Sequence, residues 1–295
     1  MRVDPTYVTN LVAALNSSQA QTEQYSAQLS SGMRVTSLST DPVAAGRNVL
    51  LLNQIQQDDS FTQTSTMVTG QLQVTDSALG QVVSQLTEAI SIATRANNGT
   101  MNAVDVQSCA NQLAGIRAEV IALANSNYQG QFIFAGGQSS TAPFTVSGST
   151  VNYNGDQGTN YLETPGGQRI QLNMPGDQIF DNPSKSVLGA LNALIADYSS
   201  GTVNTTAAVK DTVALGTALN FVSQQRVTLD NSLTQLTAAT TAVNNEKTEL
   251  IGAQTSLMQA DVAGLASQLS LSKSQQTALI SVIAGLGSGS LFDKL

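Results

Sequence analysis

The sequence predicts a mainly α-helical protein in which both ends of the chain form long helices and a small β domain is inserted between them. Residues 43–142 and 184–295 contain no proline, and a proline inside a helix costs about 3 kcal/mol. These two stretches therefore suit long helices. The segment 128–184 differs, because it holds seven of the thirteen Phe and Tyr residues and four of the six prolines.

Both ends of the chain carry a stripe at alternating spacings of three and four residues, which is typical of helices that pair as a coiled coil. We expect the apolar members of this stripe to form an assembly interface. In the N-terminal helix they are Val8, Leu11, Leu15, Tyr25 and Leu29. In the C-terminal helix they are Met258, Val262, Leu265, Leu269, Leu279, Ile283 and Leu286. Four polar positions interrupt the stripe: Ser18, Thr22, Ser272 and Gln276.

The two ends are also poor in charge. Residues 1–33 hold only Arg2, Asp4 and Glu23 as charges, and residues 262–292 hold only Lys273. Such helices lack the ion pairs and the charged surface that keep an isolated helix soluble, so their stripes must be covered by each other or by another chain. We expect the ends to become ordered on assembly. The alternative is an intramolecular bundle with a surface rich in Ser, Thr and Gln.

Further helices are expected between the terminal helices and the insert, at residues 43–97, 103–127, 186–198 and 205–251. Antiparallel pairing of the two helical halves would make a long bundle with both termini at one end. We predict three domains: a terminal helical assembly domain (1–40 and 256–295), a helical core domain (41–130 and 185–255) and an outer β domain (131–184).

Short aromatic and β-branched runs separated by turn signals predict antiparallel strands in the insert. We expect them at residues 131–135, 144–146, 151–153, 161–162 and 169–174. Asn154-Gly155 is the strongest hairpin signal, because a type I′ turn needs a positive φ at both central residues. Phe132 and Phe134 alternate with Ile133, so we expect them to pack in a core.

The composition excludes several classes of function. Only 11% of the residues are charged, against roughly 25% in an average protein. Without histidine, Ser–His and Cys–His catalysis and His-based zinc sites cannot be built. A net charge of −8 with 12 Lys and Arg argues against nucleic-acid binding. No apolar run is long enough to span a membrane, and Met1–Pro5 does not resemble a cleavable signal peptide. We expect no enzyme activity, no cofactor and no metal.

Single residues that could carry chemistry have simpler interpretations. Cys109 has no basic neighbour in the sequence to activate it, so we expect a buried structural thiol. Several carboxylates are expected to lie on solvated helix faces or in turns rather than in a catalytic or calcium site: Asp58, Asp59, Glu246, Glu249, Asp156, Asp177 and Asp181.

The segment Leu29-Ser30-Ser31-Gly32-Met33-Arg34-Val35, followed by Asp41-Pro42-Val43-Ala44-Ala45, resembles the N-terminal signature of the bacterial flagellin superfamily. Gly32 can end the first helix in a left-handed conformation. Asp41 can cap the next helix, with Pro42 as its first residue. We therefore expect an interdomain turn that uses Gly32, Arg34, Asp41 and Pro42. Met33, Leu38 and Thr40 depart from the usual pattern.

Two further segments resemble the hook–filament junction proteins of that superfamily. Tyr128–Gly137 is similar to the step that leads into their outer domain, and Ser290–Leu295 is similar to their C-terminal tail. The resemblance implies a flagellin-like fold and a structural, extracellular subunit of the bacterial flagellum that connects hook to filament through its terminal helices. The alternatives are a flagellin that forms the filament itself, and a surface adhesin that binds through the β insert.

The resemblance also implies partners. The junction proteins of the superfamily associate with copies of themselves in a ring, between a neighbouring hook-associated protein and flagellin. They are held by an export chaperone and leave the cell through the flagellar type III apparatus without a cleavable signal peptide. We expect neither nucleic acid nor membrane insertion.

Overall fold

The computed structural model describes the backbone of residues 5–148 and 150–288 and the side chains of residues 6–148 and 150–285. The chain forms two compact units. The terminal unit contains residues 1–57 and 245–295, and the central unit contains residues 58–244. The three domains predicted above remain a prediction.

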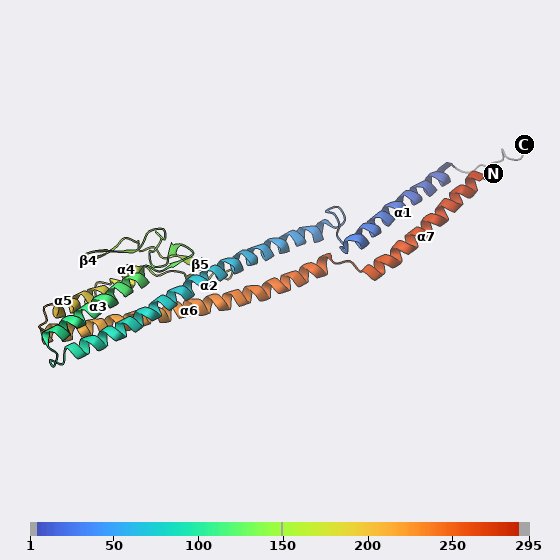
Figure 1. Cartoon of the computed structure of the whole chain (residues 1–295). Helices are drawn as coiled ribbons and strands as arrows, with labels where there is room; N and C mark the ends of the chain where they lie inside the picture. Colours follow the sequence, from blue (N-terminus) through green and yellow to red (C-terminus); the bar gives the residue numbers. More distant parts are fainter. Residues whose placement is uncertain (1–4, 149, 289–295) are drawn as a thin grey trace, which may run out of the picture. The chain divides into compact units, whose positions relative to one another are not determined.

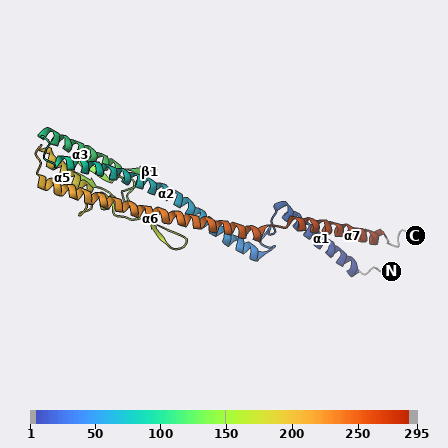
Figure 2. The same cartoon turned by 90° about the horizontal axis from the view of Figure 1, so that it is seen from below.

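Two helices from opposite ends of the chain pair in the terminal unit. They are α1 (Pro5–Ser31) and α7 (Val262–Ser288), which lie side by side and antiparallel (Figures 1 and 2). The same unit contains the start of α2 (Pro42–Ala96) and the end of α6 (Thr205–Met258). The C-terminal segment Ser290–Leu295, which carries part of the family resemblance, lies outside the described residues.

The central unit is a helical bundle. It contains the middle of α2 and of α6, together with α3 (Ala103–Ala124) and α5 (Val187–Ser199), which pack against each other. Its core contains the largest fully buried side chains: Leu72, Leu79, Leu86, Leu113, Phe134, Ile170, Ile179, Phe180, Leu188, Leu191, Leu194 and Tyr198. The four helices correspond to the predicted ones, but two bounds differ. Helix α3 ends at Ala124, where Asn125 caps it, instead of at 127, and α6 continues to Met258 instead of ending at 251. The mainly helical fold with a small β insert is confirmed.

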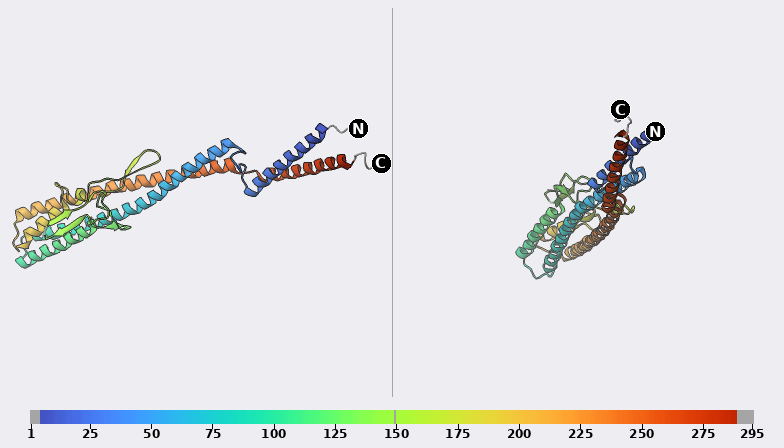
Figure 3. Two further views of the ribbon diagram at one scale, coloured as in Figure 1. Left: turned by 90° about the horizontal axis from the view of Figure 1, so that it is seen from above. Right: turned by 90° about the vertical axis from the view of Figure 1, so that its right-hand side faces the viewer.

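The strands form three separate antiparallel hairpins beside the helices of this unit (Figure 3). The first pairs β1 (Asn127–Tyr128) with β2 (Gln131–Phe132). The second pairs β3 (Phe144–Ser147) with β4 (Thr150–Tyr153), and the third pairs β5 (Tyr161–Glu163) with β6 (Arg169–Gln171). The short helix α4 (Gly176–Phe180) follows. The sequence predicted neither β1 nor α4.

The prediction of a hairpin turn at Asn154-Gly155 is wrong. The turn of the second hairpin is at Gly148, whose φ is +64°, between the paired residues Ser147 and Thr150. Asn154 instead continues the contact with the first strand of that hairpin, because its backbone N–H donates to the Pro143 carbonyl oxygen at 2.7 Å. The predicted strand 131–135 is also too long. It ends at Phe132, and the buried Phe134 uses its carbonyl oxygen to accept from the Gly176 N–H at 2.8 Å.

Among residues 5–148 and 150–288, none of the helices is both long and apolar enough to cross a membrane.

Candidate assembly surface

The turn between α1 and α2 has the geometry that its sequence predicts. Gly32 follows the last residue of α1 with a φ of +68°, a conformation that glycine adopts without a steric penalty. Pro42 is the first residue of α2. Asp41 caps this helix, because its Oδ1 accepts from the Ala44 N–H at 3.0 Å.

Arg34 ties this turn to the end of α6. Its Nη1 lies 3.0 Å from Asp41 Oδ2, and its Nη2 donates to the Leu257 carbonyl oxygen at 3.2 Å. Its backbone N–H donates to the Met258 carbonyl oxygen at 2.7 Å. The Ala44 N–H and then the Arg34 guanidinium hold the pKa of Asp41 below its usual value.

Further bonds close the turn against the segment between α6 and α7. The Gly32 carbonyl oxygen accepts from the Ala260 N–H at 3.0 Å, and Met33 forms an isolated antiparallel bridge with Gln259. Gln28 is buried and donates from Nε2 to the Arg34 carbonyl oxygen at 2.6 Å. All four residues of the predicted interdomain turn therefore lie in one connected site.

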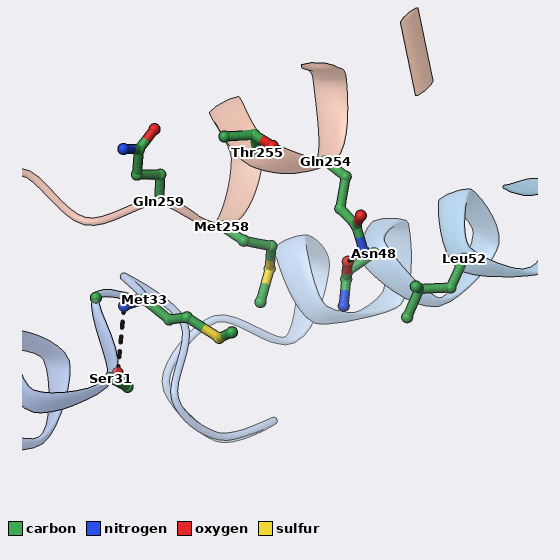
Figure 4. A pocket seen from close by; sticks show the side chains of 9 residues that line it. Ser31, Met33, Asn48, Leu52, Gln254, Thr255, Met258 and Gln259 are labelled. Carbon is green, nitrogen blue, oxygen red and sulfur yellow. Dashed lines mark hydrogen bonds between the residues drawn. The ribbon is translucent and has the colours of Figure 1, made fainter. Parts of the chain in front are cut away.

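An open groove lies beside this site (Figure 4). Its apolar walls come from Met33, Leu52 and Met258, and none of its lining residues is charged. Figure 4 also shows the bond from the Met33 N–H to Ser31 Oγ, which measures 3.2 Å. The groove belongs to the terminal unit alone.

The structure brings the two predicted stripes together within one chain. Their apolar members are mostly half-buried; Val8 and Val262 are exposed, and Met258 is the last residue of α6 rather than part of α7. Leu286 belongs to α7, but its side chain lies outside the described part of the structure. The single chain thus already pairs its terminal helices, and a role of the stripe between copies is a proposal.

The polar positions of the stripe form a connected layer across the pair. Thr22 Oγ1 lies 2.8 Å from Ser272 Oγ, and Gln276 Nε2 donates to Thr22 Oγ1 at 2.8 Å. Ser18 Oγ lies 3.4 Å from Ser272 Oγ. We call these four residues the hydroxyl layer. The sequence marked them only as interruptions of an apolar stripe, although polar residues at such positions are known to fix how coiled coils pair.

Three exposed apolar side chains near the turn were not predicted from the sequence. Leu38 is 70% exposed, Val43 66% and Leu50 69%. Val43 and Leu50 are one heptad apart on α2, and that spacing was the available signal.

The residues considered for chemistry have structural roles. Cys109 is buried, as predicted. Asp156 links two loop segments of the insert, because its Oδ1 accepts from the N–H groups of Gly137 at 2.5 Å and Gly158 at 2.9 Å. Asp58 corrects an expectation, since it is buried rather than on a solvated face. The described residues contain no group of three or more metal-ligating side chains.

Comparison with known proteins shows which class of protein the chain resembles. Residues 6–139 match the family model of the bacterial flagellin N-terminal helical region. The flagellar hook-associated protein 3 of Escherichia coli (strain K12) is 29% identical over 244 residues, which are 75% of this chain and 76% of that protein. The chain is therefore similar to the bacterial flagellins in its N-terminal part and to the flagellar hook-associated proteins along three quarters of its length.

Solved structures share the fold. A protein of Vibrio parahaemolyticus, provisionally named a flagellar hook-associated protein, has a TM-score of 0.67 at 21% identity, covering 74% of this chain and 99% of that one. The flagellar junction protein FlgL from Legionella pneumophila has a TM-score of 0.55 at 13% identity, covering 65% and 99%. The flagellin-like fold expected from the sequence is confirmed.

Proposed function

We propose that this chain is a structural subunit of the bacterial flagellum that connects the hook to the filament. The similarity to hook-associated protein 3 along three quarters of the chain supports this role. The role is structural rather than enzymatic, since the related proteins are parts of the flagellum and the chain has no histidine for acid–base work. The protein would act outside the cell, after export through the flagellar type III apparatus with its chaperone.

We infer the mechanism from the incomplete burial of α1 and α7, which we call the terminal pair. No apolar side chain described in α1 or α7 is fully buried, although the two stripes face each other. Two helices alone leave this apolar area open to water, and burying it against neighbours is favourable by about 25 cal/mol per Å². We propose that copies of the chain associate in a ring and cover it, with a hook-associated protein on one side and flagellin on the other.

Low charge supports the same arrangement. In a ring, every charged side chain recurs at each copy, so a charged interface would place like charges together. Glu23 in α1 and Lys273 in α7 are the only charges in residues 6–31 and 262–288. Neutral polar faces avoid this repulsion while remaining compatible with water.

The test is complementation of a flagellated bacterium from which the gene for hook-associated protein 3 has been deleted. We expect the deleted strain to keep its hooks and release flagellin into the medium, and this chain to restore filaments on those hooks. Long filaments formed by the purified chain alone would favour a flagellin. Hooks that remain bare although the chain is exported would contradict the proposed role. Surface binding that is lost when residues 131–184 are removed, with motility kept, would favour an adhesin.

A further inference from the structure

The buried side chains of the terminal pair are polar. Among the described side chains of α1 and α7, they are Ser18 (6% exposed), Gln28 (6%) and Ser272 (3%). Gln28 serves the turn, as described above. Ser18 and Ser272 therefore lie enclosed between the two helices, where their small side chains can be accommodated.

The hydrogen atoms of the hydroxyl layer can be placed without conflict. The Thr22 hydroxyl group donates to the Ser18 carbonyl oxygen at 2.9 Å. Thr22 Oγ1 can therefore accept from Gln276 Nε2 and from the Ser272 hydroxyl group. Ser272 Oγ then accepts from the Ser18 hydroxyl. Every hydroxyl proton in the layer has an acceptor, and such satisfied networks specify one arrangement.

The rest of the stripe selects the register poorly. One heptad from Thr22 lie Leu15 in one direction and Leu29 in the other, and Leu265 and Leu279 flank Ser272 in the same way. Leucine can pack against leucine after a shift of one heptad. Opposite charges at the edges of a coiled coil normally choose register and partner, and the pair has only Glu23 and Lys273.

Away from the turn, a shift by one heptad would be costly at the hydroxyl layer. It would place Ser272 opposite Leu15 or Leu29, so that its hydroxyl would lose its contacts with Ser18 and Thr22 and be buried against leucine. The bond between Gly32 and Ala260 holds the pair at the turn, but Thr22 lies about three helical turns further along α1.

We propose that the hydroxyl layer is the element that specifies register and crossing in the terminal pair, so that each copy presents its half-buried leucines in one fixed pattern. The layer acts on α1 and α7 of one chain, and the proposal is independent of where the protein sits in the flagellum. It predicts that removing the hydroxyl groups disorders the pairing while the helices persist.

The experiment measures the distance between spin labels at Asn10→Cys and Ser281→Cys in the purified full chain. Both positions are exposed, and the native Cys109 is buried; labelling of the chain without added cysteines checks that it stays unreacted. A shift by one heptad moves one helix about 10 Å along the other, which this measurement resolves. We expect one narrow distance distribution in the parent.

In the Thr22→Val, Ser272→Ala variant we expect a distribution about twofold broader or more, or a second population, with helicity unchanged by circular dichroism. Ser17→Ala and Ser270→Ala, which remove exposed hydroxyl groups from the same helices, are the matched controls. The single variant Thr22→Ser keeps the hydroxyl group and should show the same narrow distribution as the parent. The proposal is overturned if the double variant keeps the narrow distribution of the parent, or if the parent itself shows no defined distance.

Discussion

Arg34 and Asp41 form an ion pair, with 3.0 Å between Nη1 and Oδ2, across the turn that joins the first two helices. The second arm of the same guanidinium reaches the Leu257 carbonyl oxygen near the end of α6. Both side chains are partly exposed, at 47% and 31%, so the ion pair itself is weak. The importance of Arg34 is positional, since its hydrogen bond to Leu257 joins segments more than 200 residues apart in the sequence.

Replacing Asp41 separates its two roles. Asn is as good a helix cap as Asp, so Asp41→Asn should lose the ion pair alone and leave the first turn of α2 protected. Asp41→Ala should lose the cap as well, and amide hydrogens of that turn should exchange roughly fivefold faster. Hydrogen exchange measured by mass spectrometry checks this. Equal protection in both variants would mean that the cap does not hold the helix start.

Leu279 tests the stripe in assembly. Leu279→Asp places a carboxylate in the half-buried stripe of α7, where an unpaired charge is unfavourable. We expect fewer than about one tenth of the wild-type number of filaments per cell, with the central unit folded normally. Thr277→Asp adds the same charge at an exposed position of the same helix and should assemble. Electron microscopy of cells counts the filaments, and normal filament numbers with Leu279→Asp would remove the stripe from the assembly mechanism.

Gly70 permits a close contact with the insert. A Cβ atom at this position would collide with the Tyr128 hydroxyl group. Gly70→Ala should therefore destabilise the protein by about 1–3 kcal/mol, although alanine favours helices. Gly115 has open space around its Cβ position, so Gly115→Ala should be stabilising by up to about 1 kcal/mol. Urea unfolding distinguishes the two; a stabilised Gly70→Ala would show that Tyr128 moves aside without cost.

Tyr198 anchors α5 to α2 through its hydroxyl group. It donates to Asn97 Oδ1 at 2.8 Å and lies 3.3 Å from the Ala93 carbonyl oxygen. Burial raises its pKa to about 12. Tyr198→Phe should cost about 1 kcal/mol, whereas Tyr161→Phe, at an exposed ring, should be neutral. Thermal unfolding measures both, and equal melting temperatures would contradict the anchoring role.

Asp197 should make stability depend on pH. Burial, and then the nearby Asp211, raise the pKa of Asp197 above the usual 3.8. A carboxyl group with a raised pKa in the folded state is most compatible with folding below about pH 4, and stability falls as the pH rises through the folded-state pKa. Asp197→Asn should therefore raise the melting temperature at pH 7 and leave it unchanged near pH 3. The exposed control Glu163→Gln should change neither. Destabilisation by Asp197→Asn at pH 7 would contradict this assignment.

The helices were predictable because their signals are local. Gly32, Asp41 and Pro42 define a helix end and a helix start by their own conformational preferences. The hairpin at Asn154-Gly155 was mispredicted because tertiary contacts decided it, namely the bonds of Asn154 to Pro143 and Thr145. The contacts of Arg34 with α6 and the bonds of the hydroxyl layer join distant residues. Their partners could be recognised only once the chain was folded.

The position of the protein in the flagellum tests the central claim most directly. Immunogold labelling of purified hook–filament structures, with antibodies against residues 131–184 of this chain, locates it in complemented cells. We predict a single band of gold at the boundary between hook and filament. Labelling along the whole filament would instead identify a filament subunit and contradict the junction role.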